Sequence, residues 1–282
     1  ITPSLEDRLM YYLRLLPLLV AATALTACLN STTLVKVKPD GSGTVEQTTL
    51  INTAALKGMM PGAGAQASGP VINREDLERT AARMGKGVRL VSAEKATGDA
   101  GFEGTKAIFA FDDINQIQIS QDPNMGGSTS GRLSSEPTAD DPVKFKLTRG
   151  AGTTTLTINY IDKPPTSTEK PYPSPAGGDM PDLTNPMIMN MMKTMFQGFK
   201  INIGLEVVGS IVKTNAEYVS GPRITLLEMD VAELLSDEAK LKALQGKISG
   251  SPDSLSLSQV RPLLKDIKGI KIDGPSISVE FR

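Results

Sequence analysis

Apolar and polar side chains alternate with a period of two residues along much of this chain. The clearest case is TTLVKVKPDGSGTVEQTTLIN, in which two β-forming runs flank the segment 40–43. Successive residues of a strand point to opposite faces of a sheet, and glycine tolerates the positive φ angles of tight turns. The pattern therefore predicts a hairpin here, and a second hairpin over 143–160 with RGAG at its turn.

Further strands are expected over 87–95, 102–111, 201–207 and 277–281, each with its apolar residues on one side. Such one-sided strands are typical of antiparallel sheets that leave one face in water. We therefore expect an α+β fold, in which an antiparallel sheet built from hairpins packs with a few helices and carries long flexible loops. The stretch 207–230 is expected to form another hairpin, with its turn at Thr-Asn-Ala.

Local capping signals predict three helices in addition to a Met-rich one described below. The first covers 73–84 and begins at Asn73, a residue type that caps helix N-termini. The second begins at Asp230, which opens a capping-box pattern, and is expected to reach about residue 245. A shorter third helix is expected over 257–267.

The composition divides the chain into four stretches. Residues 1–27 form an N-terminal extension with a signal segment, 28–161 a β-rich first part of the folded region, 162–183 a Pro-rich linker, and 184–282 an α+β second part. Two further segments, the Gly- and Ala-rich 55–70 and the apolar-poor 120–142, are expected to be loops.

The chain has one cysteine, Cys28, preceded by an apolar stretch from Leu15 and by Arg14. The stretch is about 13 residues long, and a membrane-spanning helix needs about 20. A positive end, an apolar stretch and small residues at a cut site are the layout of a secretory signal. The residues LTAC at 25–28 resemble the lipobox of bacterial lipoproteins.

The lipobox resemblance implies cleavage between Ala27 and Cys28 and attachment of a diacylglycerol, usually with a further acyl chain such as palmitate, to Cys28. Ordinary cleavage after Ala27, a retained short anchor and a buried structural cysteine are the alternatives. Two or three acyl chains anchor a protein stably, so the folded part would be an ectodomain held at a cell-envelope membrane. β-Forming residues follow Cys28 at once, so the first strand is expected to start almost directly after it. Where two membranes are present, Leu29 after the cysteine favours the outer one, by resemblance.

Composition excludes several functions. The chain contains no histidine, so triads, histidine bases and most catalytic zinc or iron sites are not available. A net charge of −1 argues against nucleic acid. The adjacent acids Asp112 and Asp113 are expected to serve as a helix cap and those at 140–141 to lie in a loop. We therefore expect no enzyme activity, no catalytic residue, no metal and no cofactor.

The segment NPMIMNMMKTMFQGF predicts a helix that is apolar around most of its circumference. Its apolar residues form the candidate pocket or contact face: Met187, Met189, Met191, Met192, Met195 and Phe196. Methionine is flexible and suits surfaces that accommodate varied ligands, but it also fills ordinary cores. Three interpretations stay open: a core helix, the wall of an apolar cavity, or a contact with membrane or another protein.

The pattern G-x-I-x-x-T-N-A…G-x-x-I-T-L over 209–226, together with the hairpin after Cys28, is similar to LppM-type bacterial lipoproteins. The resemblance implies an α+β ectodomain with a curved antiparallel sheet around a helix, able to enclose an apolar pocket. The expected function is a tethered binding module for an apolar or lipid-like ligand, with the membrane as partner through Cys28. The alternative is a structural or protein-interaction lipoprotein of the envelope, with a filled core and an envelope protein as partner.

Overall fold

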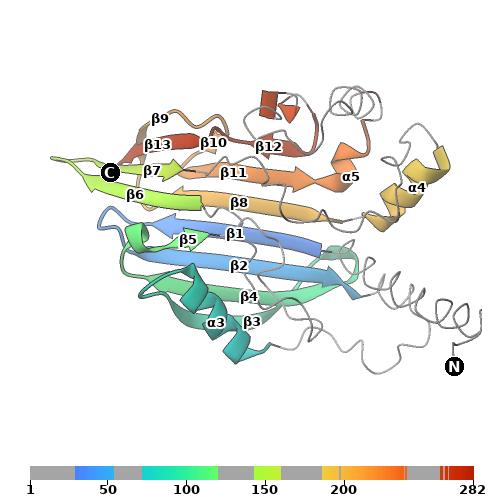
Figure 1. The fold of residues 1–282 in the computed structure, drawn as a ribbon, viewed down its shortest axis with the longest axis horizontal. Coiled ribbons are helices and arrows are strands. Elements are labelled where there is room, and N and C mark those ends of the chain that lie inside the picture. The colour runs from blue at the N-terminus through green and yellow to red at the C-terminus, as the bar shows by residue number, and fades with distance from the viewer. Residues whose placement is uncertain are drawn as a thin grey trace, which may run out of the picture.

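The computed structural model describes residues 29–53, 72–119, 143–159, 186–196, 198–237, 239, 261–262, 264–265 and 267–282. Within these residues two β-sheets share one hydrophobic core, with a helix beside them (Figure 1). The predicted signal segment, Cys28, the loops 55–70 and 120–142 and the linker 162–183 lie outside the described residues. Of the helix expected from Asp230 to about residue 245, residues 238 and 240–245 also lie outside them, and the described helix ends at Leu234.

The described strands form two sheets. The larger runs in the order β10-β11-β8-β1-β2-β4-β3, with β12 also paired to β11, and the smaller in the order β5-β6-β7-β13-β9. The strands of the larger sheet are β1 (Leu29–Val37), β2 (Gly43–Asn52), β3 (Arg89–Thr97), β4 (Phe102–Phe111), β8 (Lys200–Val207), β10 (Val219–Ser220), β11 (Arg223–Asp230) and β12 (Ile270–Ile272). Those of the smaller sheet are β5 (Gln118–Ile119), β6 (Val143–Arg149), β7 (Thr154–Asn159), β9 (Ile211–Thr214) and β13 (Ser276–Phe281). The helices are α3 (Arg74–Met84), α4 (Pro186–Met195) and α5 (Val231–Leu234), with 3-10 turns η2 (Asp99–Gly101) and η3 (Ile114–Gln116).

Two of the three predicted hairpins are confirmed. Strands β1 and β2 pair from Leu29↔Ile51 to Val37↔Gly43, and β1 begins one residue after Cys28. At their turn, Gly41 has a φ of 83°, and the Asp40 carboxylate accepts a hydrogen bond of 2.9 Å from the Ser42 amide. Strands β6 and β7 form the second hairpin.

The α+β class is confirmed, but the antiparallel description holds fully only for the smaller sheet. In the larger sheet β1 pairs in parallel with β8, from Asn30↔Lys200 to Val37↔Val207. The larger sheet is therefore mixed. Strands from the stretches before and after the linker lie side by side in both sheets, since β13 pairs with β7 in the smaller one.

The predicted hairpin across Thr-Asn-Ala is wrong. Strand β9 pairs with β13 in the smaller sheet, whereas β10 pairs with β11 in the larger one, so 215–218 crosses between sheets. The hairpin does not form because β9 is held in the smaller sheet by its pairing with β13. Ser210 and Arg282 exchange two backbone hydrogen bonds, of 2.9 and 3.1 Å. Gly209 has a φ of 139°, and a Cβ at this position would clash with the Arg282 carbonyl oxygen.

Helix α3 follows its sequence signals. The Asn73 side chain caps it by accepting a hydrogen bond of 3.1 Å from the Glu75 amide, and Gly85 ends it with a φ of 142°. It buries Leu77, Thr80, Ala81 and Met84. Leu77, Ala81 and Met84 belong to the main core. Helix α3 and the smaller sheet therefore cover different parts of the same face of the larger sheet.

We call this covered face of the larger sheet the inner face. Its buried apolar residues include Val35 of β1, Val45 of β2, Phe109 of β4 and Leu205 of β8, which lie in one row across the sheet. Opposite them lie Phe145, Leu156, Ile158, Ile277, Val279 and Phe281 of the smaller sheet. The main core is therefore centred on the half of the larger sheet where β1 ends.

Candidate functional site

The predicted site residues fall into two groups. Ala27 and Cys28, the predicted cleavage and lipidation sites, lie outside the described residues. The first described residue is Leu29, at the start of β1. The Met-rich segment forms α4 as predicted, although the side chains of Met191 and Met195 lie outside what is described.

The described side chains of α4 differ in their environments. Met189 is only 3% exposed and forms a small cluster with the buried Leu235, which is separate from the main core. Met192 and Phe196 are half-buried against the same cluster. Met187, by contrast, is 80% exposed. Helix α4 therefore has one face in an apolar cluster with α5 and at least one methionine directed to solvent.

Backbone and charged contacts fix the position of α5. The amide of Val231 donates a 3.1 Å hydrogen bond to the carbonyl of Phe199, just after α4. The Asp230 carboxylate accepts a 3.1 Å hydrogen bond from the Glu233 amide, as the capping prediction requires. It also pairs with Lys200 at 2.6 Å, and this hydrogen bond raises the pKa of Lys200 against the opposing effect of burial.

Sequence reasoning missed a polar stripe on the inner face. The stripe consists of Ser31, Thr33, Gln47, Thr49 and Thr105. Its members are paired neighbours on three adjacent strands, through Ser31↔Thr49, Thr33↔Gln47 and Thr49↔Thr105. Because β-strand side chains alternate, they point to the same face as Val35, Val45 and Phe109.

The polar stripe lies where the main core ends. Ile203 and Ala107 are the last core members in the row of Thr33, and no residue of the next row, that of Ser31, belongs to the core cluster. Thr33 is buried, but the other four stripe residues are half-buried and retain contact with solvent. The buried Ile201 and Ile203 of β8 lie beside Ser31 and Thr33. The stripe therefore combines hydroxyl and amide groups with an apolar border.

The sequence does contain a signal for this stripe. Residues 30–33 read NSTT and residues 46–49 read EQTT, so polar side chains occupy consecutive positions and both faces of the strands become polar there. An apolar inner face would instead require every second residue to be apolar.

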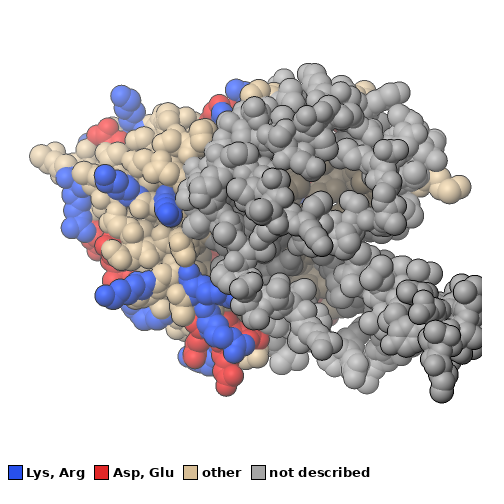
Figure 2. Space-filling view, in the orientation of Figure 1, with Lys and Arg blue, Asp and Glu red and all other residues tan. Residues whose placement is uncertain are grey.

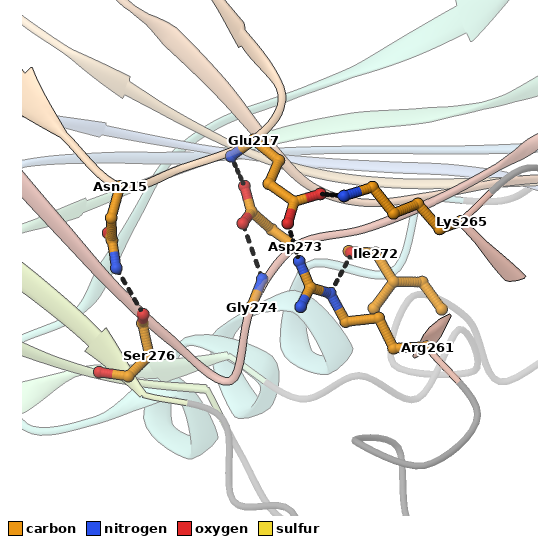
Figure 3. Close-up of polar contacts among 8 residues, drawn as sticks. All are labelled: Asn215, Glu217, Arg261, Lys265, Ile272, Asp273, Gly274 and Ser276. Atoms are coloured by element: carbon orange, nitrogen blue, oxygen red, sulfur yellow. Dashed lines mark hydrogen bonds and ion pairs between the residues drawn. The ribbon is translucent and has the colours of Figure 1, made fainter. Parts of the chain in front are cut away.

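A second polar cluster lies where the chain crosses between the sheets (Figure 3). Asp273 is 2% exposed, and its carboxylate accepts hydrogen bonds from the backbone amides of Glu217, at 3.0 Å, and Gly274, at 2.7 Å. Both crossing segments, 215–218 and 273–275, are thereby tied together. The Asp273 carboxylate is engaged by backbone groups, which indicates a structural role.

Asn215 of the Thr-Asn-Ala motif belongs to the same structural tie. Its side chain donates to the Ser276 carbonyl at 3.1 Å and accepts from the Ser278 amide at 2.7 Å. Glu217 pairs with Arg261 at 2.5 Å and Lys265 at 3.3 Å, and the Lys265 hydrogen bond, followed by that of Arg261, lowers the pKa of Glu217. The motif that carries the family resemblance thus joins the sheets.

Within the described residues, no group of three or more His, Cys, Asp or Glu side chains is placed to hold a metal ion. None of the described helices is long and apolar enough to cross a membrane. Asp113 caps η3, as expected, by accepting a 3.0 Å hydrogen bond from the Asn115 amide, and Asp112 pairs with Arg89 at 3.0 Å.

The described elements define the class: an α+β protein of one mixed and one antiparallel sheet around a common core. No protein-family model matches the chain, and no curated protein matches it. The chain is similar in structure to the folded domain of LppM from Mycobacterium tuberculosis, solved by NMR, with a TM-score of 0.34 and 9% sequence identity over 90% of each chain.

Proposed function

We propose that this chain is a lipid-anchored lipoprotein of the bacterial cell envelope, cut before Cys28 and held at a membrane by acyl chains on that cysteine. The support is the LTAC sequence behind a short apolar stretch, together with the start of β1 at Leu29. A cut before Cys28 removes no residue of the described fold. The folded part then lies outside the cytoplasm, on the periplasmic face or the outer membrane where two membranes are present.

The tethered domain, in this proposal, is a non-enzymatic binding module for an apolar or lipid-like ligand. The observation that carries it is the polar stripe, whose half-buried hydroxyl and amide groups lie on a sheet face beside buried isoleucines. Binding sites commonly combine an apolar lining with a few polar groups that orient the ligand. Hydroxyl and amide groups both donate and accept hydrogen bonds, so they suit the polar part of an amphipathic molecule.

The rival function is a structural or protein-interaction lipoprotein whose inner face is filled by the chain itself. The two functions differ in what the purified protein carries. We expect the chain from Leu29 onward, purified from a bacterial envelope, to retain a lipid-like adduct in native mass spectrometry. An empty protein that captures an envelope protein on cross-linking would instead favour the rival.

A substitution on the polar stripe tests the site more sharply. Thr49→Val removes one hydroxyl from the inner face at almost constant volume. Loss of one hydrogen bond of about 0.5–1.5 kcal/mol lowers affinity about 2- to 10-fold, so the fraction of adduct-bearing protein should fall.

Thr48→Val is the matched control, because Thr48 is the neighbouring residue on the same strand, is also half-buried and points to the opposite face. We expect Thr48→Val to retain the adduct fraction of the parent protein. Equal adduct loss in both variants, or none in either, would show that the polar stripe does not contact the ligand.

A further inference from the structure

Helix α4 and the start of β1 lie at the same end of the larger sheet. Asn30 of β1 pairs with Lys200, the first residue of β8, and α4 precedes β8 by a short connection. Figure 1 shows α4 at the end of the sheet where β1 begins, away from the β1–β2 turn. The attachment residue, Cys28, is covalently bonded to Leu29 at this same end.

Several described side chains at the α4 end are apolar, and they lie beside the ion pair of Lys200 and Asp230. Phe196 and Phe199 stack edge to face, with their ring centroids 6.1 Å apart. Leu29 is buried at the sheet margin, and Val231 packs against the α4 cluster. Met187 extends this apolar group into solvent with 80% of its surface exposed.

The opposite end of the sheet is charged. The β1–β2 turn carries Asp40, whose carbonyl accepts a hydrogen bond from Arg149, and the exposed Lys38. Asp112 and Arg89 form an exposed ion pair near the end of β4, and the chain ends nearby at Arg282. Figure 2 shows Lys, Arg, Asp and Glu side chains at this end, on the left of the view, and also along its lower middle.

We propose that α4 lies on the bilayer surface, with the Met187 side of the helix inserted among the lipids. This inference rests on the proposed attachment at Cys28. One residue spans at most about 3.6 Å, so a lipid attached immediately before β1 holds this end of the sheet within a few ångströms of the lipid head groups. A helix with an exposed methionine at this end of the sheet gains contact with lipid, whereas the charged end, about 26 Å away along β1 at ~3.3 Å per residue, stays in water.

The composition provides a direct test, because the chain contains one cysteine and no tryptophan. Residues 28–282, which hold every described element, are coupled through Cys28 to a maleimide-bearing lipid in phosphatidylcholine vesicles. Met187→Trp then places the only tryptophan on α4. Val208→Trp is the control, because Val208 is 49% exposed and its amide donates to the Val37 carbonyl at the charged end.

Vesicles containing brominated acyl chains should quench Met187→Trp about twofold and shift its emission to the blue, because tryptophan at the interface contacts the acyl chains. Val208→Trp should show neither change. Equal quenching of the two variants, or none of Met187→Trp, would overturn the proposed orientation.

The maleimide linkage replaces the natural acyl chains, so this result does not depend on whether the cell acylates the protein. The mass of the N-terminal peptide from the cellular protein tests acylation of Cys28 separately. An unmodified Cys28 would refute the proposed tether, and an unquenched Met187→Trp would refute the orientation alone.

Discussion

Removal of the Asp273 carboxylate should destabilise the protein more than removal of any exposed charge nearby. Asp273 is 2% exposed and accepts amide hydrogen bonds from Glu217 and Gly274, which come from two different crossings between the sheets. Hydrogen bonds to charged groups contribute about 1.5–3 kcal/mol each, and a buried donor without an acceptor costs about 1–3 kcal/mol. Allowing for water at Gly274, we expect Asp273→Ala to lower the free energy of unfolding by about 3 kcal/mol.

Asp273→Asn separates the two hydrogen bonds. The amide keeps one acceptor oxygen but turns an NH₂ group toward the second backbone donor, so about 1–2 kcal/mol should be lost. Lys265→Ala is the control, because Lys265 is 58% exposed and pairs with Glu217 in the same cluster. Exposed ion pairs contribute about 0.2–1 kcal/mol, which sets the expected loss for this variant.

Urea unfolding of the soluble chain from Leu29, followed by circular dichroism, measures these differences. Hydrogen exchange adds a local readout, because the Glu217 amide should lose protection in Asp273→Ala. A loss within 0.5 kcal/mol of that in Lys265→Ala, at the precision of such measurements, would refute the view that Asp273 joins the two sheets.

Two further predictions concern a close backbone contact at Gly104 and the stability of the protein at acid pH. A Cβ at Gly104 would meet the carbonyl oxygen of Thr49, so Gly104→Ala should cost about 3 kcal/mol. At Gly204 a Cβ would lie 3.3 Å from a flexible Leu34 methyl and 3.4 Å from the Arg223 Nε and the Ile224 carbonyl oxygen, which are near-ordinary contacts, so Gly204→Ala should cost about 1 kcal/mol or less. Similar midpoints in urea would contradict this contrast. The lowered pKa of Glu217 means that its ion pair with Lys265 stabilises the fold above the ordinary carboxyl pKa of 4.5 and is lost as pH falls through the lowered value. The parent should therefore lose up to about 1 kcal/mol more stability than Glu217→Gln on acidification through this range, and parallel pH profiles of the two would refute the assignment.

Elements with local signals were predictable. The Asn73 cap, the Asp40–Gly43 turn and the Asp230 cap each depend on residues a few positions apart, and the structure places all three as expected. Strand alternation likewise located β4 and β13 within a residue or two. These features form because neighbouring residues satisfy backbone groups or set φ angles, whatever the rest of the chain does.

The pairing partners of the strands were harder to predict from the sequence. The four-residue β9 was expected to fold back on its neighbour, but it pairs with β13, which lies far along the sequence. A short strand has few cross-strand contacts, and a distant partner with a better register can replace the local one. The polar stripe was not predicted, because the strands were predicted from the alternation of their apolar residues. Runs of polar residues such as NSTT, at 30–33, indicate where this alternation ends.

The parallel pairing of β1 and β8 has the largest consequence for function. Parallel strands begin at the same end of a sheet, so the segment before β8 enters the sheet at the same end as the segment before β1. Helix α4 precedes β8 and Cys28 precedes β1, which brings the Met-rich helix to the proposed lipid attachment. If β8 had paired with β1 in the antiparallel sense, as the expected antiparallel sheet would require of neighbouring strands, α4 would lie at the end of the charged β1–β2 turn instead. The proposed membrane orientation therefore depends on one strand pairing that no local sequence signal specifies.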